Sequence, residues 1–482
     1  PLYYYQQENN LFWASELKSI KNQCENELVL SKNSISLFFQ LTYIPAPHTI
    51  YENVYKLEAN SYIEFDCSGN NIILKKIKEP VHSNQKSYKN ISFKEAKVIT
   101  KDLIFDSVRS RSISDVPIGT FLSGGVDSSI VSYCLSKELD KKIDTFSIGF
   151  QKKSFDESDK ARTVSKLINS NHHEYIISDK DLIDDANNIL LNYDEPFADP
   201  SALPTFLVSK YTSNNVKVAL TGDGGDELFG GYNKYYMGKI NNIYSKYIPQ
   251  NLHNSLLKNS DRLLSSRSDK RGGVFKLNKL LRAVDYNNDF YFKIISLGFQ
   301  ERELINLFSF SSNNNELLNY YRGSSNEIVS INDFRNIDRK LSLEGDLLVK
   351  VDRASMLSSI ECRSPFLNKD ILNFTSQLPD NYLLKGWNKK FLLKESFKEF
   401  FPEKFLDKSK QGFAVPVGDW LKTSFSTELL GYIDKDLLLS QNIFNINFIT
   451  KLVEDHLNSV IDNTYRVWTF YCFQKWYVNN IL

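Results

Sequence analysis

The stretch from Val116 to Val131, VPIGTFLSGGVDSSIV, constrains the fold of this chain more than any other. It starts as a short apolar run typical of a strand, is interrupted at Ser123-Gly124-Gly125, and continues into a second apolar run with helical spacing. Adjacent glycines let the backbone approach a ligand closely, and the N–H groups at a helix start favour phosphate binding. The pattern therefore predicts a strand, a phosphate-binding glycine loop and a helix.

Three polar residues at the predicted helix start add chemistry to this loop. Ser128 and Ser129 supply hydroxyls beside the unpaired N–H groups of the first helical turn. Asp127 would repel phosphates there unless a divalent cation lay between the anions, so the loop indicates a nucleotide with Mg²⁺. A Gly-Gly pair without these polar residues would indicate only a strand-to-helix turn. The loop matches neither the Walker-type phosphate motif GxxxxGK[ST] nor the dinucleotide-binding motif GxGxxG.

The composition limits the class of protein. A chain of 482 residues is longer than one ordinary core, so we expect two domains. Lys and Arg (59) balance Asp and Glu (58), which argues against a nucleic-acid partner. The five cysteines lack CxxC spacing and favour reduced, buried thiols, and no apolar run is long enough to span a bilayer. We therefore expect a cytoplasmic protein with neither a nucleic-acid nor a membrane partner.

Strand-like and helix-like segments alternate through the middle of the chain. After the glycine loop, strands are expected at Thr145 to Phe150, His173 to Ile177 and Val216 to Leu220. Helix-like stretches separate them, at 158–168 and 181–191. This alternation predicts an α/β fold with a doubly wound parallel sheet, whose ligands bind at the carboxyl ends of the strands. We expect helices with loops from 240 to 330, and a helical C-terminal part from 333 to 482.

The N-terminal region is predicted to be a small α+β unit, residues 1–80. A hairpin is expected from Pro1 to Ala14, a helix from Ser15, a second helix at 36–41, and strands at 54–57, 61–65 and 72–77. Residues 81–91 are polar and are expected to be a linker to a second domain at 92–482.

A second glycine-rich cluster, TGDGGDE, follows the predicted strand at 216–220. A solvated acidic turn would be the ordinary interpretation of three acids and three glycines in seven residues. Here the strand should lie in the same sheet as the glycine loop, so Asp127 and Asp226 are predicted to converge on one Mg²⁺.

The ordered set of motifs carries a resemblance to a known family. SGGVDSS alone resembles the pyrophosphate-binding loop of the ATP pyrophosphatase superfamily. Together with TFSIGF, TGDGGDELFGGY, VDRASMLSSIECRSPFL and KQGFAVPVGDWL, it resembles the synthetase domain of glutamine-hydrolysing asparagine synthetases. The end of that family's glutaminase domain is similar to three segments at the start of this sequence: PLYYY, WASELKSI and YIPAPHTIYENVYKL. The resemblance covers nearly the whole chain.

The resemblance implies a ligase that adenylates a carboxylate with ATP and Mg²⁺ and then forms an amide. It implies ATP-binding roles for Leu122, Ser123, Gly124, Gly125, Asp127, Ser128, Ser129, Ile148, Thr221 and Gly222. Asp223 occupies the place of a family acid near the acceptor, where a carboxylate orients an ammonium or accepts a proton. Lys410 occupies the place of a lysine that offsets charge on the departing pyrophosphate.

Two departures from the family pattern bear on the substrates. The catalytic cysteine and the glutamine-binding residues of the family precede the segment that matches Pro1 to Tyr5, and the sequence does not contain them. We expect glutamine to supply nitrogen in a longer parent protein, and ammonia to supply it to this chain. DEPFADPSALPT, from 194 to 205, replaces a Thr- and Arg-containing stretch that holds aspartate in some members. L-aspartate is therefore the first choice of acceptor, and a sugar acid of surface polysaccharide is the alternative.

Other readings of the sequence stay open. A nucleotide-binding module without turnover is a third possible function, since the glutaminase residues are missing from the sequence. The protein could also form a homodimer. Glu361 and Arg363, expected in mixed helix and loop, are interpreted as an internal ion pair. Asp346 and Asp352 are weaker candidates for the acceptor site. The pair at 172–173 is interpreted as the opening of a strand, because no third histidine or acid lies at metal-ligand spacing.

Overall fold

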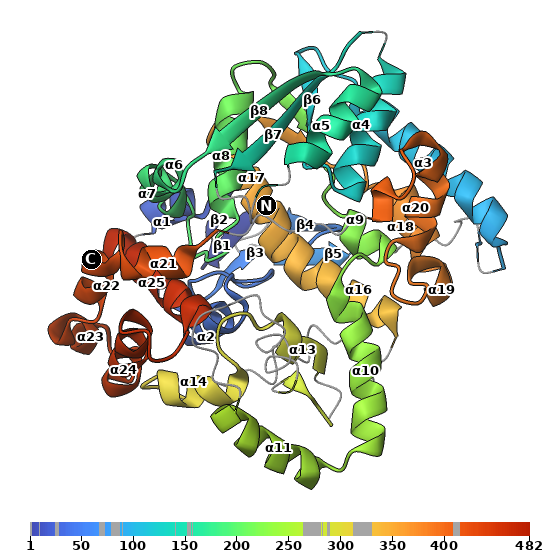
Figure 1. Cartoon of the computed structure of the whole chain (residues 1–482). Helices are drawn as coiled ribbons and strands as arrows, with labels where there is room; N and C mark the ends of the chain where they lie inside the picture. Colours follow the sequence, from blue (N-terminus) through green and yellow to red (C-terminus); the bar gives the residue numbers. More distant parts are fainter. Residues whose placement is uncertain are drawn as a thin grey trace.

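The computed structural model describes residues 2–8, 10–24, 28–66, 73–78, 87–88, 90–139, 141–151, 156, 158–263, 281, 283–286, 290–311, 330–407 and 415–482. Lys410 and most of the expected linker, 81–86 and 89, lie outside these residues. Figure 1 shows the whole chain, with strands in the middle and upper part of the view and helices on several sides of them.

The N-terminal strands form an antiparallel sheet in the order β2-β1-β3. Its strands are β1 Tyr3–Gln7, β2 Asn10–Ala14 and β3 Val54–Lys56, and a separate hairpin is formed by β4 Ser61–Asp66 and β5 Ile73–Lys78. Tyr3 and Tyr5 point into the core, whereas Tyr4 pairs with Trp13 on the opposite face, where Trp13 is 66% exposed. The predicted hairpin and strands are confirmed.

Helix α2 (Lys32–Leu41) joins this N-terminal sheet to the rest of the molecule. All residues from Ser34 to Leu41 are buried, because α2 packs against α25 (Thr464–Asn480) and α14 (Glu301–Leu307). The ring of Phe39 contacts four other phenylalanines from those regions: Phe299, Phe308, Phe444 and Phe473. Figure 1 shows α2 beside the C-terminal helices, so distant parts of the sequence share one core.

The central sheet has five parallel strands in the order β10-β9-β6-β7-β8. They are β6 Ile118–Phe121, β7 Asp144–Phe150, β8 Asn171–Ile177, β9 Val218–Leu220 and β10 Glu361–Arg363. Strand β6 pairs with β9 on one side and β7 on the other, with Thr120 opposite Leu220 and Thr145. The loops that follow β6 and β9 therefore leave the same edge of the sheet side by side.

Helices cover both faces of this sheet. Helices α3 (Phe93–Arg111), α4 (Val126–Glu138) and α5 (Ser158–Ile168) share one hydrophobic cluster, and α8 (Ala202–Thr212) and α17 (Leu348–Met356) contribute to another. Two separate cores on one parallel sheet are what a doubly wound fold requires, so the predicted α/β class is confirmed.

The remaining described elements are helical. They are α1 Leu17–Gln23, α6 Asp179–Asp184, α7 Ala186–Leu190, α9 Gly225–Phe229, α10 Asn233–Tyr247, α11 Gln250–Leu263, α13 Phe290–Ile295, α16 Ile331–Asp338, the π-helix η1 Arg339–Leu347, α18 Lys369–Ser376, α19 Asp380–Leu383, α20 Phe391–Phe397, the 3₁₀ turns η2 Lys398–Phe400 and η3 Phe405–Asp407, α21 Val417–Lys422, α22 Ser426–Tyr432, α23 Lys435–Gln441 and α24 Ile446–Leu457. None of the helices in the described ranges combines the length and apolar character of a membrane-crossing segment.

Three local predictions need correction. The segment with Glu361 and Arg363 is strand β10 rather than mixed helix and loop, because its three residues pair in parallel with β9. The helix expected at 181–191 is two short helices, α6 and α7. The pair Glu361–Arg363 is an ion pair at 2.7 Å, but Glu361 has a side chain 58% exposed, so the pair is not internal.

Candidate active site

The loop after β6 has the conformation that its glycines predict. Gly124 adopts φ +72°, and a Cβ there would overlap Lys160 and lie 2.7 Å from the backbone nitrogen of Ala161. No side chain caps the N-terminus of α4, which begins directly after Gly125. The loop therefore presents an uncapped helix start, where the helix dipole and N–H groups favour an anion.

Hydroxyl groups surround this helix start. Ser123 Oγ lies 3.0 Å from Ser128 Oγ, and the Ser123 backbone N–H donates to Ser128 Oγ over 3.3 Å. The hydroxyls of Ser129 and Thr221 are both buried and have no hydrogen-bond partner among the described residues. Buried polar groups are normally paired, so the two orphaned hydroxyls indicate that a polar ligand belongs here.

The acidic loop after β9, residues 221–227, packs against the N-terminus of α4. A Cβ at Gly222 would lie 2.8 Å from Asp127 Cβ and 2.9 Å from the Ser128 backbone nitrogen, so only glycine permits this contact.

Leu122 and Ile148, which are expected beside the nucleotide, are buried in the sheet. The Leu122 N–H donates a hydrogen bond to the Phe146 carbonyl at 2.8 Å. The structure thus gathers the predicted ATP-binding residues at one edge of the sheet.

Asp127 and Asp226 converge, as the sequence predicted, and a lysine lies between them. Lys390 Nζ is 2.5 Å from Asp127 Oδ2 and 2.6 Å from Asp226 Oδ1. Lys390 is buried, and burial alone would lower its pKa, but the two carboxylates outweigh burial and raise the pKa of Lys390 above its usual value. Cβ atoms at Gly225 and Gly231 would collide with this cluster, so both positions require glycine.

Sequence reasoning missed Lys390. The one signal was indirect: two carboxylates predicted to meet need a cation, and Lys389-Lys390 precedes the apolar run of α20. Lys390 is also the N-cap of α20 and adopts a left-handed conformation with φ +52°, which is uncommon for a non-glycine residue.

Asp223, in the acidic loop, lies beside the end of strand β10. Its backbone carbonyl accepts a hydrogen bond from Ser364 Oγ, and the neighbouring Thr221 N–H donates to the Arg363 carbonyl at 2.9 Å. The Asp223 side chain is half-buried. Arg363 also donates to the Arg111 carbonyl at 3.0 Å and the Ile113 carbonyl at 2.7 Å, which supports the structural role predicted for it.

A second buried lysine, Lys350 of α17, contacts the stretch 194–205 that departs from the family pattern. Lys350 Nζ lies 3.1 Å from Asp199 Oδ2 and 2.9 Å from Ser201 Oγ, and its residue is 8% exposed. Burial raises the pKa of Asp346 well above its ordinary range, and the charge of Asp199 raises it further. Asp346 Oδ1 is buried with no hydrogen-bond partner in the described part of the chain, whereas Asp352 is exposed.

The paired histidines take part in the sheet. Strand β8 opens at Asn171, directly before His172, as predicted. His172 Nδ1 is 2.9 Å from Thr145 Oγ1, and His173 Nε2 is 2.9 Å from Asp144 Oδ1. Among the described residues no group of three or more His, Cys, Asp or Glu side chains is arranged to hold a metal.

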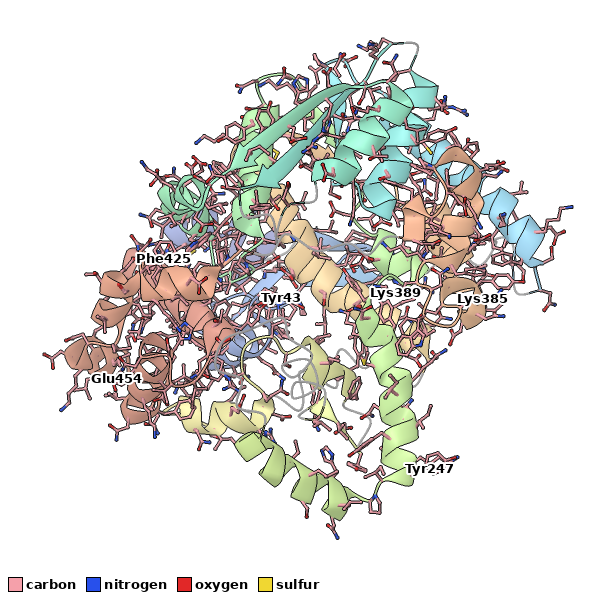
Figure 2. The ribbon with its side chains drawn as sticks, viewed as in Figure 1. Tyr43, Tyr247, Lys385, Lys389, Phe425 and Glu454 are labelled. Carbon is pink, nitrogen blue, oxygen red and sulfur yellow. The ribbon has the colours of Figure 1, made fainter. Side chains whose placement is uncertain are left out.

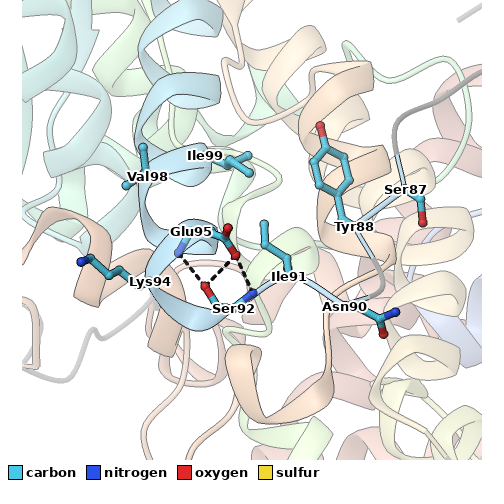
Figure 3. A pocket seen from close by; sticks show the side chains of 9 residues that line it. All are labelled: Ser87, Tyr88, Asn90, Ile91, Ser92, Lys94, Glu95, Val98 and Ile99. Atoms are coloured by element: carbon cyan, nitrogen blue, oxygen red, sulfur yellow. Dashed lines mark hydrogen bonds between the residues drawn. The ribbon is translucent and has the colours of Figure 1, made fainter.

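A cavity lies away from this site, and none of the predicted site residues that the structure describes lines it. It measures about 880 Å³ and lies at the start of α3, beside Tyr88, Ile91 and Val98 (Figure 3). The Ser92 hydroxyl accepts from the Glu95 N–H, and the Glu95 carboxylate accepts from the Ser92 N–H at 3.0 Å. This capping box already occupies the helix start, so the cavity offers no anion site.

The parallel sheet, with a glycine loop after β6 and an acidic loop after β9, defines a nucleotide-binding α/β domain of the ATP pyrophosphatase type. The Asparagine synthase family matches residues 100–478, and the Glutamine amidotransferase domain matches residues 1–76. The chain belongs to the asparagine synthase family, which confirms the resemblance and makes it a ligase that forms C–N bonds.

Relatives extend this match along the chain. Asparagine synthetase [glutamine-hydrolyzing] 1 of Bacillus subtilis is 29% identical over an alignment of 486 positions, which covers 100% of this chain and 74% of that protein. Asparagine synthetase [glutamine-hydrolyzing] 3 of the same organism is 23% identical over 88% of this chain and 66% of that protein. Asparagine synthetase [glutamine-hydrolyzing] of Zea mays is 34% identical over an alignment of 145 positions, which covers 27% of this chain and 24% of that protein. Such relatives support ATP-dependent amidation at the level of the family.

Proposed function

We propose that the chain amidates a carboxylate through an acyl-adenylate, with L-aspartate as the acceptor and L-asparagine, AMP and pyrophosphate as the products. A carboxylate is a poor electrophile because oxide does not leave, whereas AMP does. The observation that carries the proposal is the meeting of Asp127 and Asp226 beside the uncapped start of α4. Pyrophosphate departing from ATP would accumulate negative charge there.

ATP is assigned to the edge where the loops after β6 and β9 meet. Backbone groups of Leu122, Ile148 and Gly222 frame the adenosine in this proposal, with the orphaned Thr221 hydroxyl beside them. Ser123, Gly124, Gly125, Ser128 and Ser129 receive the phosphates at the helix start. Lys410, outside the described residues, keeps its proposed role of offsetting the charge of the pyrophosphate.

The donor set fits Mg²⁺. Two carboxylate oxygens lie within 2.6 Å of one point, and hard oxygen ligands together with substrate phosphates are what Mg²⁺ prefers. Asp127 and Asp226 would hold the ion, although the Lys390 ammonium has to vacate that point first. When bound, Mg²⁺ would neutralise charge on the departing pyrophosphate.

The acceptor is assigned to the neighbourhood of Asp223 and Lys350. The two groups are close enough for the charge of Asp223 to help raise the pKa of Lys350. Lys350 supplies a buried cation for an acceptor carboxylate, and the unpaired Oδ1 of Asp346 supplies an acceptor for an ammonium. An amino acid carries both groups, which favours aspartate over a sugar acid that lacks an amine. In this proposal Asp223 orients the ammonia that attacks the adenylate.

Nitrogen and domain organisation complete the proposal. Residues 1–80 are assigned to the far part of a glutaminase domain, 81–91 to a linker and 92–482 to the synthetase domain. Ammonia reaches the adenylate directly in an assay of this chain, and glutamine is the proposed nitrogen source wherever a complete glutaminase domain is present. The match of residues 1–76 to the Glutamine amidotransferase domain supports this assignment.

The test is pyrophosphate release with ATP, Mg²⁺ and ammonium, comparing L-aspartate with a uronic acid and an amino-sugar acid. Release with aspartate, lost in Asp223→Asn and weakened at least tenfold by Lys350→Met, is the expected result. Lys210→Met is the control, because Lys210 of α8 has a side chain 49% exposed in its ion pair with Asp185 and does not contact any described residue of the predicted site. Release only with a sugar acid would favour the polysaccharide alternative, and nucleotide binding without release would favour the module without turnover.

A further inference from the structure

The ammonium of Lys390 lies at the point where a divalent cation would be shared by two carboxylates. Its distances of 2.5 Å to Asp127 and 2.6 Å to Asp226 are those of direct, charge-assisted contacts. The side chains of Lys390 and Asp127 are less than 10% exposed and that of Asp226 is 27% exposed, so water screens these charges only in part. Removing the lysine would leave two carboxylates facing each other in a poorly solvated site.

The charges of this cluster change when nucleotide binds. Asp127, Asp226 and Lys390 carry a net charge of minus one, whereas the two carboxylates alone would carry minus two. A free divalent ion entering beside Lys390 would meet a positive charge at its own binding point. A divalent ion that enters with a triphosphate brings anionic oxygens, to which the displaced lysine can turn.

The backbone of Lys390 indicates that this placement is constrained. Its left-handed conformation, with φ +52°, costs a lysine conformational energy that the surrounding structure has to compensate. The residue before it, Lys389, is only half-buried and lies at the start of α20 (Figure 2). The strained residue is thus the one that reaches the carboxylates.

We propose that Lys390 is an internal cation that substitutes for Mg²⁺ between Asp127 and Asp226 in the nucleotide-free enzyme, and so makes metal binding depend on ATP. This inference rests on the proposed metal role of the two aspartates. It predicts that the wild-type protein binds Mg²⁺ or Mn²⁺ weakly without nucleotide, because the metal has to displace a paired lysine. Lys390 then becomes available to the phosphates only when the metal has arrived.

The test measures Mn²⁺ binding by electron paramagnetic resonance without nucleotide and with a non-hydrolysable ATP analogue. Lys390→Met is expected to bind Mn²⁺ alone at least tenfold more tightly than wild type. Lys389→Met is the matched control, since it removes a positive charge one residue away and should bind Mn²⁺ alone as weakly as wild type. Lys390→Gln is the second variant in case the methionine fails to fold.

Thermal unfolding gives a second readout that does not involve catalysis. Without metal, Lys390→Met should melt below wild type and recover when Mn²⁺ is added, whereas wild type should not respond to Mn²⁺ alone. Equal binding of Mn²⁺ by wild type and both Lys390 variants would overturn the proposal. If the double variant Asp127→Asn, Lys390→Met still binds Mn²⁺ tightly, the metal lies elsewhere and the inference is wrong. The proposed function is tested separately, by the pyrophosphate release assay.

Discussion

Lys56 in the N-terminal sheet forms a buried ion pair with Glu195, which belongs to the loop before α8. The Lys56 ammonium also donates to the Ile44 carbonyl at 2.6 Å, and Glu195 accepts from the Ile50 N–H at 3.2 Å. Next to this pair, Arg353 of α17 lies 3.2 Å from Asp194. The N-terminal region is therefore joined to the central sheet by paired charges as well as by the core around α2.

Breaking the Lys56–Glu195 pair should destabilise the protein strongly. Lys56→Met leaves a buried carboxylate without its cation, so we expect a loss of about 3–5 kcal/mol in the free energy of unfolding. Lys18→Met, at an exposed pair with Glu16, should cost less than about 1 kcal/mol. Urea unfolding checks both, and a double variant Lys56→Met, Glu195→Gln should recover part of the loss. Similar costs for Lys56→Met and Lys18→Met would show that the buried pair contributes little.

Gly231→Ala should strongly reduce pyrophosphate release. A Cβ at this position would overlap both Asp226 Oδ1 and the side chain of Lys390, so the carboxylate has to move. We expect pyrophosphate release to fall at least tenfold. Gly431→Ala is the control, because a Cβ there meets nothing within 4 Å and alanine is the better helix former in α22. Full activity in Gly231→Ala would show that the carboxylates do not need their observed positions.

Stability should fall between pH 6.5 and 4 in a way that depends on His48. Burial lowers the pKa of His48 to about 4, and the charge of Lys56 adds to this effect. Because the unfolded chain takes up the proton first, the stabilisation present above pH 6.5 is lost as the pH falls through 4, by at most about 3 kcal/mol. Urea unfolding at pH 7 and 4.5 should show a smaller loss for His48→Gln than for wild type. Equal losses would contradict the prediction.

Cys362, on the strand beside Asp223, should react slowly with thiol reagents in the folded protein. Burial raises the pKa of its thiol to about 12, so little thiolate is present near pH 8. Maleimide labelling followed by peptide mapping should detect Cys362 only after urea is added. Rapid labelling of the native protein at this peptide would show that the strand is more open than the structure indicates.

Much of the site was predictable because parallel strands end at one edge. Asp127 and Asp226 follow strands β6 and β9, and neighbouring parallel strands bring their loops together whatever the intervening sequence. Lys390 was not predictable in the same way, since 263 residues separate it from Asp127 and no periodic pattern marks it. Strand β10 was missed because three residues are too few to show alternation, and only pairing with β9 defines them.

The acceptor side was the least predictable part. The sequence places Asp199 in an unusual stretch, but its partner Lys350 lies 151 residues away on a different helix. A charged residue on a helix is ordinarily solvated, so Lys350 gave no signal of its own. Its burial follows from the packing of α17 against α8, which is a tertiary effect.

The most direct test of the central claim, adenylation of a carboxylate, follows an oxygen atom. L-aspartate with oxygen-18 in its side-chain carboxylate is incubated with ATP, Mg²⁺ and ammonium, and the nucleotide and phosphate products are examined by mass spectrometry. An acyl-adenylate places one carboxylate oxygen on phosphorus, so we predict AMP that carries one oxygen-18 and pyrophosphate that carries none. Label in inorganic phosphate with ADP as the nucleotide product would contradict the account, because the carboxylate would then have attacked the terminal phosphate.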